Sequence, residues 1–446
     1  MKARFGTDGL RGRAGDLITP ELAQRLGRSS ARILGAPAGR IYLGRDTRWS
    51  GTMLAAAFAS GAAAEGIDVV DLGVVPTPVV ACMAAGGGCP GAVVSASHNP
   101  YPDNGIKLFA AGGTKLRDDQ EAAVEADMAS GGATYLSGDR LGRVVADPDA
   151  LARYLDKLTD ALQGRSLSGI KVVLDTANGA AVATAREAFE RAGAEVVDIV
   201  GAVPDGININ AGCGSSDPSV LASSVLRAGA NLGLAFDGDA DRVVAVDDAG
   251  RLVDGDRLLA LFATDLKERG QLLGGGIAVT VMSNLGLHKA MAHAGIDVVT
   301  TQVGDRNILE ALESRGWSLG GEQSGHIVFP GLATTGDGVL TGLLLADLVV
   351  RAGRTLGELG ANCMRSHPQV TLNVAVARRD ELEGAAVIWN EVALVEKNLG
   401  DSGRVLLRAS GTEQLVRVMV EAADEAEASA AADRLAGAVA RILSDR

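Results

Sequence analysis

Three aspartates that could bind a metal ion, Asp237, Asp239 and Asp241, stand at alternate positions directly after the apolar run 232–236. Carboxylate oxygens that follow a buried strand can converge on one hard cation, and ligation by oxygen alone suits Mg²⁺. A calcium-binding EF-hand loop would need glycine at its sixth position, where Arg242 stands. The alternative is a solvated acidic turn, but clustered carboxylates behind a buried strand repel one another unless a cation is present. The pattern therefore predicts a magnesium site.

A serine that could act as a nucleophile follows a second apolar run, 91–94. The sequence continues as SASHNP at 95–100, which contains Ser97 and His98, and Lys107 lies ten residues after Ser97. A serine hydroxyl at the end of a strand suits phosphoryl or acyl transfer, although the stretch could also be an ordinary turn. Acyl transfer favours a G-x-S-x-G elbow, which is absent around Ser97. Phosphoryl transfer requires a metal ion and cationic groups, both of which this chain could supply.

Two further stretches carry groups that suit the binding of an anion or a sugar. The segment RASGTE at 408–413, with the arginine that follows it, combines guanidinium groups, hydroxyls and a glycine, as a phosphate cradle would. Its candidate phosphate-binding residues are Arg408, Ser410, Gly411, Thr412 and Arg417. The segment GEQSGH at 321–326 offers Glu322 and Ser324 for sugar hydroxyls. Each segment alone could be a surface strand end or a glycine-rich turn.

The elements that must position these residues form an internal repeat. A glycine followed by alternating acidic and Val or Ile residues occurs at 66–71, 193–198 and 295–300, each time after an earlier apolar run and a stretch of helical length. A strand, a helix that ends at a glycine, and a second strand make up the βαβ unit. We therefore predict an α/β protein with three tandem related domains of mixed, largely parallel sheets and a distinct C-terminal α+β domain, arranged around a central cleft. The predicted domains are 1–150, 151–250, 251–365 and 366–446.

The composition limits the compartment and the partners. The 446-residue chain has 42 Lys and Arg against 55 Asp and Glu, for a formal net charge of −13. This charge repels polyanions, so nucleic acid is not an expected partner. No run of 18 apolar residues indicates a membrane span, and the first residues do not have the pattern of a signal peptide. The four cysteines form no CxxC motif, which fits a reducing cytoplasm.

Taken together, the motifs identify a family resemblance. SASHNP at 95–100, DGDADR at 237–242, GEQSGH at 321–326 and RASGTE at 408–413 occur in the order and spacing of the α-D-phosphohexomutases, four-domain enzymes that interconvert sugar 1- and 6-phosphates. The chain is most similar to the bacterial branch that acts on glucosamine phosphates, through FGTDGLRG at 5–12, DGININAGCGSSDP at 205–218, VGDRNI at 303–308 and TTGDG at 334–338. Gln323 stands where the mannose and glucose branch has methionine. Gln414 departs from a common proline, which could loosen the phosphate loop.

The resemblance implies a role for each matched residue. Ser97 would carry a phosphoryl group and share Mg²⁺ with Asp237, Asp239 and Asp241. The implied groups around the transferring phosphoryl are Arg11, Lys107 and His326, with Arg242 in support. The implied sugar ligands are Glu322 and Ser324, and the residues implied to bind the second phosphate are Arg408, Ser410, Gly411, Thr412 and Arg417. His98 would orient the serine loop or pack as a structural residue.

The resemblance also implies the reaction. Glucosamine 6-phosphate and glucosamine 1-phosphate would interconvert through a 1,6-bisphosphate of glucosamine or glucose, and the product would enter UDP-N-acetylglucosamine and cell-wall synthesis. The partner is then a small sugar phosphate, with no nucleic acid and no membrane, and the sequence leaves a homodimer open. The alternatives are a mutase acting on mannose or glucose phosphates, a serine phosphatase and a non-catalytic sugar-phosphate sensor.

Overall fold

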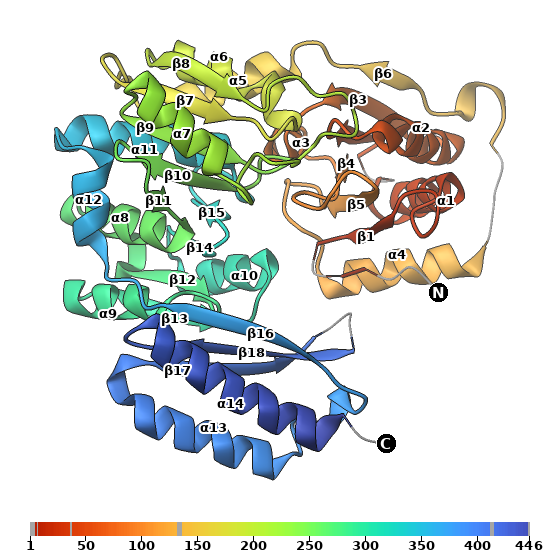
Figure 1. Ribbon diagram of the computed structural model, residues 1–446. Helices are drawn as coiled ribbons and strands as arrows, with labels where there is room; N and C mark the ends of the chain where they lie inside the picture. The colour runs from red at the N-terminus through yellow and green to blue at the C-terminus, as the bar shows by residue number, and fades with distance from the viewer. Residues whose placement is uncertain (1–4, 7, 36–37, 132–135, 411–413, 445–446) are drawn as a thin grey trace. The chain divides into compact units, whose positions relative to one another are not determined.

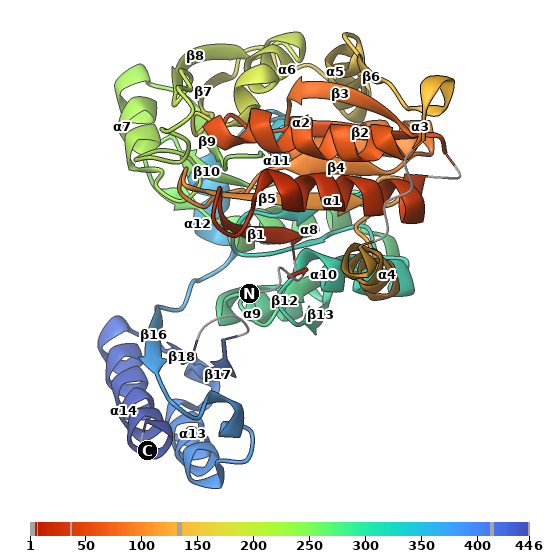
Figure 2. The same cartoon turned by 90° about the vertical axis from the view of Figure 1, so that its right-hand side faces the viewer.

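The computed structural model describes residues 5–6, 8–35, 38–131, 136–410 and 414–444. The chain divides into two compact units, residues 1–280 with 299–361 and residues 281–298 with 362–446, and each unit is described by itself. Figures 1 and 2 show the elements from two sides. Among the described residues, every helix is too short or too polar to cross a lipid bilayer.

The first sheet of the larger unit has six described strands in the order β1-β5-β4-β2-β3-β6. Strands β4, β2, β3 and β6 run parallel, and β5 is antiparallel to both β4 and β1. The strand bounds are β1 Leu10–Arg13, β2 Arg40–Arg45, β3 Asp68–Val74, β4 Gly91–Val94, β5 Asp103–Phe109 and β6 Val144–Ala146. The helices of this region are α1 Pro20–Ser30, α2 Trp49–Ala64, α3 Thr77–Gly87 and α4 Asp118–Ser130.

Helices cover both faces of this first sheet because its central strands are apolar on both sides. Ile41 and Leu43 of β2 share one core with residues of α1, α2 and α4. Gly44, on the opposite face, packs against α3 so closely that an added Cβ would lie 2.6 Å from a methyl of Val80. This close packing brings the first turn of α3 to the edge of the sheet where the parallel strands end.

The second sheet has the described order β11-β10-β9-β7-β8, in which β9, β7 and β8 run parallel and β10 is antiparallel to both of its neighbours, β9 and β11. Its strands are β7 Lys171–Asp175, β8 Glu195–Val200, β9 Leu232–Phe236, β10 Val243–Asp247 and β11 Leu252–Val253. Its helices are α5 Ala150–Ala161, α6 Ala185–Arg191, α7 Ser219–Ala228 and α11 Gly338–Ala352. Leu221 and Val225 of α7 pack on one face, and α6 and α11 meet Leu234 on the other.

A third sheet has the described order β13-β12-β14-β15. Its strands are β12 Gly276–Thr280, β13 Asp297–Thr301, β14 Gly320–Gly321 and β15 Ile327–Val328, and the helices of this region are α8 Gly255–Glu268 and α10 Asp305–Arg315. Ile308 and Leu312 of α10 pack with Ala278 and Val328 of the sheet. Strands β14 and β15 form a tight antiparallel pair, so the segment between them is a short turn.

The smaller unit is built on the antiparallel sheet β16-β18-β17. Its elements are β16 Gln369–Ala375, β17 Arg404–Ala409, β18 Leu415–Glu421, α9 Leu285–Ala294, α13 Ala386–Leu399 and α14 Glu425–Leu443, and α12 Leu356–Cys363 spans the boundary. Apolar residues of α13 and α14 share one core with β18. The buried Glu421 of β18 binds Arg404 (Nε to Oε2, 2.6 Å) and accepts a hydrogen bond from the backbone N–H of Leu285 (3.0 Å), so α9 belongs to this unit.

The predicted α/β class with a distinct C-terminal α+β region is confirmed, and the repeated segments form β3, β8 and β13. The last helix, α14, begins at Glu425, because the side chain of Asp424 caps it by accepting from the N–H of Glu427. The pattern did not predict the antiparallel strands β5 and β10. Both strands follow a buried strand after only a short loop, so they lack the helix that marks a βαβ unit.

Candidate active site

Ser97 lies in the loop between β4 and β5, and its side chain is fully buried. Its hydroxyl donates a hydrogen bond to Oδ2 of Asp237 (2.5 Å) and lies 3.3 Å from Nδ1 of His98. The backbone at Ser97 has φ +53°, a left-handed conformation that non-glycine residues rarely adopt. The loop is therefore held by its surroundings in a form that directs the hydroxyl at the acidic cluster.

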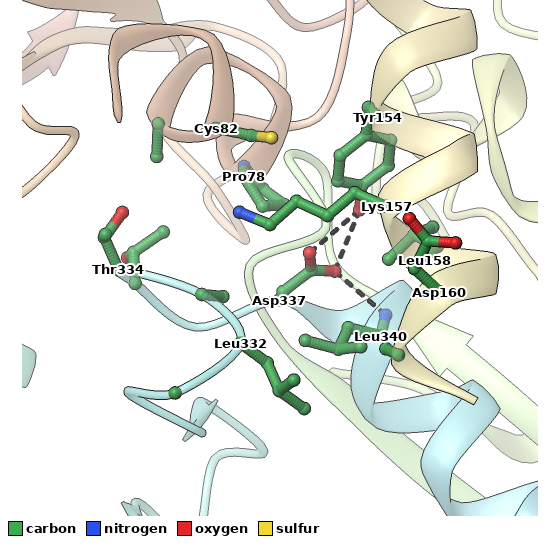
Figure 3. A pocket seen from close by; sticks show the side chains of 15 residues that line it. Pro78, Cys82, Tyr154, Lys157, Leu158, Asp160, Leu332, Thr334, Asp337 and Leu340 are labelled. Atoms are coloured by element: carbon green, nitrogen blue, oxygen red, sulfur yellow. Dashed lines mark hydrogen bonds between the residues drawn. The ribbon is translucent and has the colours of Figure 1, made fainter. Parts of the chain in front are cut away.

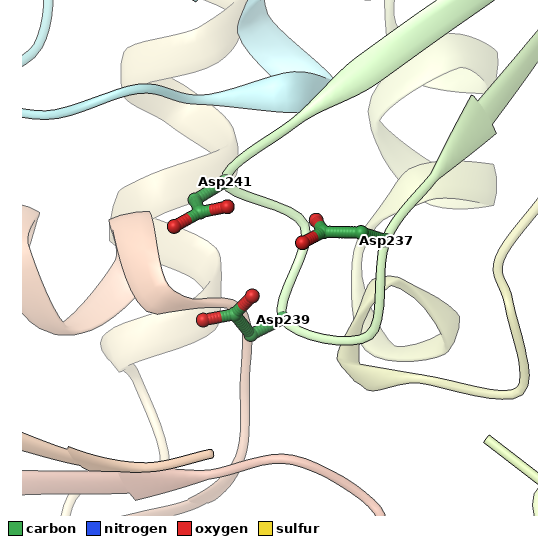
Figure 4. A group of neighbouring side chains, drawn as sticks. All are labelled: Asp237, Asp239 and Asp241. Carbon is green, nitrogen blue, oxygen red and sulfur yellow. The ribbon is translucent and has the colours of Figure 1, made fainter. Parts of the chain in front are cut away.

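The three aspartates predicted to bind a metal lie together in the loop between β9 and β10 (Figure 4). All three are buried, and one carboxylate oxygen from each lies within 4.8 Å of the others. Among the described residues, Oδ1 of Asp239 and Oδ1 of Asp241 are buried without a hydrogen-bond partner. Buried carboxylate oxygens with no donor carry a desolvation cost that a hard cation would relieve. The residues therefore fit Mg²⁺.

The acidic loop packs directly against the serine loop. An added Cβ at Gly238 would lie 2.5 Å from the carbonyl oxygen of Ser97, so a residue with a side chain does not fit without displacing one of the two loops. Thr77, at the start of α3, supports the acidic loop. Its hydroxyl donates to Oδ2 of Asp239 (2.6 Å), and its N–H donates to the Asp239 carbonyl (2.9 Å).

Lys107, on β5, supplies a buried cation to the cluster. Its Nζ lies 2.7 Å from Oδ2 of Asp239, 3.1 Å from Oδ2 of Asp241 and 3.1 Å from Oδ2 of Asp8. Burial alone would lower the pKa of Lys107, but these three carboxylates raise it well above the ordinary value. The ammonium group is therefore a permanent charge that partly neutralises the cluster.

The carboxylates of the cluster differ in electrostatic environment. Burial, together with the charges of Asp241 and Asp239, raises the pKa of Asp237 well above its ordinary value. Burial alone would also raise the pKa of Asp241, but Lys107, His326 and Arg242 lower it well below that value. Asp237, which accepts from Ser97, is thus the carboxyl that most lacks a compensating positive charge.

A second group of charges extends the cluster. Asp8 forms ion pairs with Lys107, Lys115 and Arg11, and Lys115 also lies 2.8 Å from Oδ2 of Asp305 at the start of α10. Burial alone would raise the pKa of Asp8, but the three cations lower it well below its ordinary value. The predicted residue Arg11 is thus held beside Lys107 through their shared partner Asp8.

His326 and Arg242 complete the predicted groups around Ser97. The backbone N–H of Gly336 donates to Nε2 of His326 (3.1 Å), which leaves Nδ1 as the nitrogen that carries a proton, and Nδ1 faces Oδ2 of Asp241 at 3.9 Å. Arg242 donates from its backbone N–H to Oδ1 of Asp237 (3.2 Å), and its Nη1 lies 3.3 Å from Nδ1 of His98. His98 therefore lies between Arg242 and the Ser97 hydroxyl.

The predicted sugar ligands lie in the turn between β14 and β15. The hydroxyl of Ser324 donates to Oε2 of Glu322 (3.4 Å), and Oε1 of Glu322 accepts from the N–H of Gly304 (3.3 Å). The charge of Glu322 contributes to raising the pKa of Arg242, although burial alone would lower that pKa. This turn therefore belongs to the same electrostatic environment as the acidic cluster.

The predicted phosphate-binding residues lie in the smaller unit. Arg408 on β17 and Arg417 on β18 stand directly opposite each other across the antiparallel pair. Burial and the charge of Arg417 lower the pKa of Arg408. Two guanidinium groups that face the same side of a sheet at opposed positions suit the binding of an anion such as phosphate. Ser410 is buried and follows β17, whereas Gly411 and Thr412 lie outside the described residues.

A cavity of about 190 Å³ lies beside the segment 334–338 (Figure 3). The buried hydroxyl of Tyr154 donates to Asp337 (2.9 and 3.0 Å to its two oxygens), and Asp337 caps α11 by accepting from the N–H of Leu340 (3.0 Å). Lys157 and Cys82 also line the cavity. None of the residues predicted for catalysis lines it.

Several residues of the site were not predicted. They are Asp8, Thr77, Lys115 and Asp305, and, in support of the serine loop, Arg48 and Asn210. Three of them lie in motifs that carried the family resemblance, FGTDGLRG, VGDRNI and DGININAGCGSSDP. A charged or amide residue inside such a motif is the signal that could have identified them.

Comparison with known proteins agrees with this geometry. The chain matches four family descriptions, "Phosphoglucomutase/phosphomannomutase, alpha/beta/alpha domain I" over residues 2–134, domain II over 152–250, domain III over 254–367 and the C-terminal domain over 372–438. This chain belongs to the phosphoglucomutase/phosphomannomutase family. The predicted family, the fold class and the isomerase (mutase) class of enzyme are thereby confirmed.

Relatives and solved structures cover almost the whole chain. Phosphoglucosamine mutase of Rhodococcus opacus is 52% identical over 99% of this chain and 100% of its own length. A phosphoglucomutase/phosphomannomutase family protein of Burkholderia thailandensis has a crystal structure with a TM-score of 0.82 and 26% identity, over 99% of this chain and 98% of the other. N-acetylphosphoglucosamine mutase of Aspergillus fumigatus, crystallised with GlcNAc-6P and magnesium, has a TM-score of 0.70 and 21% identity over 98% and 95% of the two chains.

Proposed function

We propose that this chain interconverts glucosamine 6-phosphate and glucosamine 1-phosphate, with Ser97 as the carrier of the phosphoryl group. The observation that carries the proposal is the buried Ser97 hydroxyl, 2.5 Å from Asp237 of the three-aspartate cluster. The chain as a whole is 52% identical to phosphoglucosamine mutase of Rhodococcus opacus, over 99% of its length. The product would enter UDP-N-acetylglucosamine and cell-wall synthesis.

The reaction is an exchange in which no phosphate is lost. Phospho-Ser97 gives its phosphoryl group to the free hydroxyl of the sugar phosphate, so the bond from phosphorus to the serine oxygen breaks and a bond to the sugar oxygen forms. The resulting 1,6-bisphosphate turns over in the site. Its other phosphoryl group then returns to Ser97, and the isomeric monophosphate leaves. Glucosamine or glucose 1,6-bisphosphate would phosphorylate the serine initially.

The groups around Ser97 suit this transfer. The cations of Lys107 and Arg11 would stabilise charge on the phosphoryl oxygens, and Nδ1 of His326 could exchange a proton with the sugar hydroxyl. Asp237, Asp239 and Asp241, together with the phosphorylated Ser97, would hold Mg²⁺. When bound there, Mg²⁺ would supply positive charge to the transferring group and offset the three carboxylates.

The remaining predicted ligands would hold the rest of the substrate. Glu322 and Ser324 suit the sugar hydroxyls, with Arg242 beside them. The predicted ligands of the phosphate that does not react are Arg408, Ser410, Gly411, Thr412 and Arg417. Holding one phosphate while the other transfers allows a single site to serve both ends of the sugar.

Other expectations stay predictions. They are Mg²⁺ as the natural metal, the four-way division at residues 150, 250 and 365 around a central cleft, a homodimer, and a cytoplasmic location. The relative from Aspergillus fumigatus that was crystallised with magnesium supports the choice of metal. The small sugar phosphate remains the expected partner.

The deciding experiment measures the intact mass of purified protein before and after incubation with glucosamine 1,6-bisphosphate. Wild type should gain one phosphoryl group, and the variant Ser97→Ala should gain none and lose turnover. Turnover of the 6-phosphates of glucosamine, glucose and mannose, compared in the same protein, should favour glucosamine. A large preference for mannose, steady release of inorganic phosphate, or full activity of Ser97→Ala would contradict the proposal.

A further inference from the structure

The loop that carries Ser97 turns its main-chain carbonyls toward one buried guanidinium group. Arg48, immediately before α2, has no exposed side-chain surface and makes five hydrogen bonds, one for each of its N–H groups. One bond, from Nε, goes to Oδ2 of Asp46 at 2.8 Å. The other four go, at 2.9, 2.7, 2.6 and 3.1 Å, to the carbonyl oxygens of Ser97, Asn99, Pro100 and Asp103.

Asp46 connects the same guanidinium to the N–H of Ser97. Its Oδ2 also accepts from the hydroxyl of Ser95 (2.6 Å), and that hydroxyl accepts from the backbone N–H of Ser97 (2.9 Å). The N–H and the carbonyl of Ser97 are thus both fixed by the buried pair Asp46 and Arg48. Because the pair is fully enclosed, solvent does not compete for these bonds.

Asn210 holds the serine loop from the second sheet. It lies in the connection between β8 and α7, inside the motif DGININAGCGSSDP. Its Nδ2 donates to the carbonyl oxygens of Ser97 (2.9 Å) and Asn99 (3.2 Å), two of the carbonyls that Arg48 also binds. The carbonyl of Ser97 therefore accepts from residues attached to two different sheets.

The hydrogen bonds from Arg48 and Asn210 to the serine loop do not involve the hydroxyl of Ser97. The bonds go to main-chain oxygens, so they are the same whether or not Ser97 carries a phosphoryl group. They also hold the backbone at Ser97 in its left-handed conformation. For a residue other than glycine this conformation costs about 1 kcal/mol or more. Displacement of a reacting atom by about 1 Å can slow a transfer by about 100-fold. A fixed loop therefore matters for the rate in both half-reactions.

We propose that Arg48 and Asn210 are positioning residues, which clamp the carbonyls of the serine loop so that the Ser97 oxygen keeps its place beside Asp237. The inference rests on the proposed function of Ser97 as phosphoryl carrier. Neither side chain is needed to bind the sugar phosphate. Loss of either clamp slows phosphoryl exchange at Ser97 and leaves the affinity for the bisphosphate unchanged.

The main test uses the near-isosteric variant Asn210→Asp. Asn210 has φ +59°, a conformation that asparagine and aspartate both tolerate, so the exchange adds little backbone strain. A carboxylate in place of the amide donor faces two carbonyl oxygens and repels them. The matched control is Asn231→Ala, which removes a side-chain hydrogen bond to the N–H of Lys171 at the start of β7. Arg48→Lys tests the other clamp, because an ammonium group has three donors where the guanidinium uses five.

Phosphorylation of Ser97 by glucose 1,6-bisphosphate is followed by intact mass in a single turnover. We expect Asn210→Asp to slow it at least tenfold, Arg48→Lys to slow it further, and Asn231→Ala to match wild type. Each substitution is repeated in the Ser97→Ala background, where calorimetry should give a dissociation constant for the bisphosphate within twofold of Ser97→Ala alone. Melting temperatures monitor folding, and if Arg48→Lys does not fold, Asn210→Asp decides.

The outcomes separate the inference from the proposed function. Transfer at the wild-type rate in Asn210→Asp overturns the inference, and so does a loss of bisphosphate affinity in the Ser97→Ala background that matches the loss of rate. If wild type itself gains no phosphoryl group at Ser97, the proposed function fails, and the inference fails with it.

Discussion

The substitution Asp337→Asn should make the protein more stable at neutral pH. Burial raises the pKa of Asp337 to about 6 from an ordinary 3.8, although the N–H of Leu340 and the hydroxyl of Tyr154 oppose that rise. At about 1.36 kcal/mol for each unit of pKa, keeping this carboxylate charged above pH 6 costs about 3 kcal/mol. Asparagine has the shape of the neutral acid, can still cap α11, and avoids this cost.

The sign of the pH dependence follows from proton binding. Between pH 3.8 and about 6 the folded wild type binds more protons at Asp337 than the unfolded chain does, so its stability falls as the pH rises through this window. Asp337→Asn lacks this decline. The two proteins should therefore be nearly equal in free energy of unfolding near pH 4 and differ by about 3 kcal/mol in favour of the variant above pH 7.

The assay is urea unfolding of wild type and Asp337→Asn at pH 4.5, 5.5, 6.5 and 7.5, followed by circular dichroism. Asp160 lines the same cavity as Asp337. The variant Asp160→Asn is therefore the control: it makes the same change from carboxylate to amide at a different position of the cavity. The reasoning is refuted if the difference between wild type and variant stays constant over this range. It is also refuted if the variant is the less stable protein at pH 7.5.

Three further predictions concern the candidate site. Asp239→Asn should lower turnover at least 100-fold, because one of three metal ligands loses its charge, and a weakened increase in melting temperature on adding MgCl₂ would verify the cause. Lys107→Met should destabilise the protein by about 3–5 kcal/mol, since it leaves Asp239 and Asp241 without their buried cation, and MgCl₂ should restore part of the lost melting temperature; equal melting with and without the salt would count against this reading. Arg408→Ala should raise KM for the sugar phosphate by roughly 10- to 100-fold with a smaller change in kcat, whereas an unchanged KM would remove this arginine from the phosphate site.

The sequence alone was sufficient for the parts of the molecule that repeat. Alternation of Val and Ile with acidic residues after a glycine predicted β3, β8 and β13, because a half-buried parallel strand imposes that period. The cluster of Asp237, Asp239 and Asp241 was predictable too, since only a cation makes three carboxylates behind an apolar strand stable. These predictions rest on local pattern and on charge.

The remaining contacts depend on distances between segments far apart in the chain. Asn210 binds the carbonyl of Ser97 across 113 residues, and Lys107 meets Asp239 across 132. A local motif can single out such an amide or lysine, but it does not show which distant residue the side chain contacts. Arg48 is a stronger case, because an arginine beside a helix start is usually exposed, whereas here its side chain is completely enclosed.

The division of the chain into two units has a consequence for protein engineering. The path crosses between the units three times, after residues 280, 298 and 361, so the smaller unit is an insertion combined with a tail. Ending the chain at residue 365 would remove Glu421 and Arg404, whose side chains bind the N–H of Leu285 and the carbonyl of Ser283. A shortened protein would therefore retain α9 without these two contacts. A fragment intended to carry the serine and the aspartates alone should replace residues 281–298 with a short linker as well.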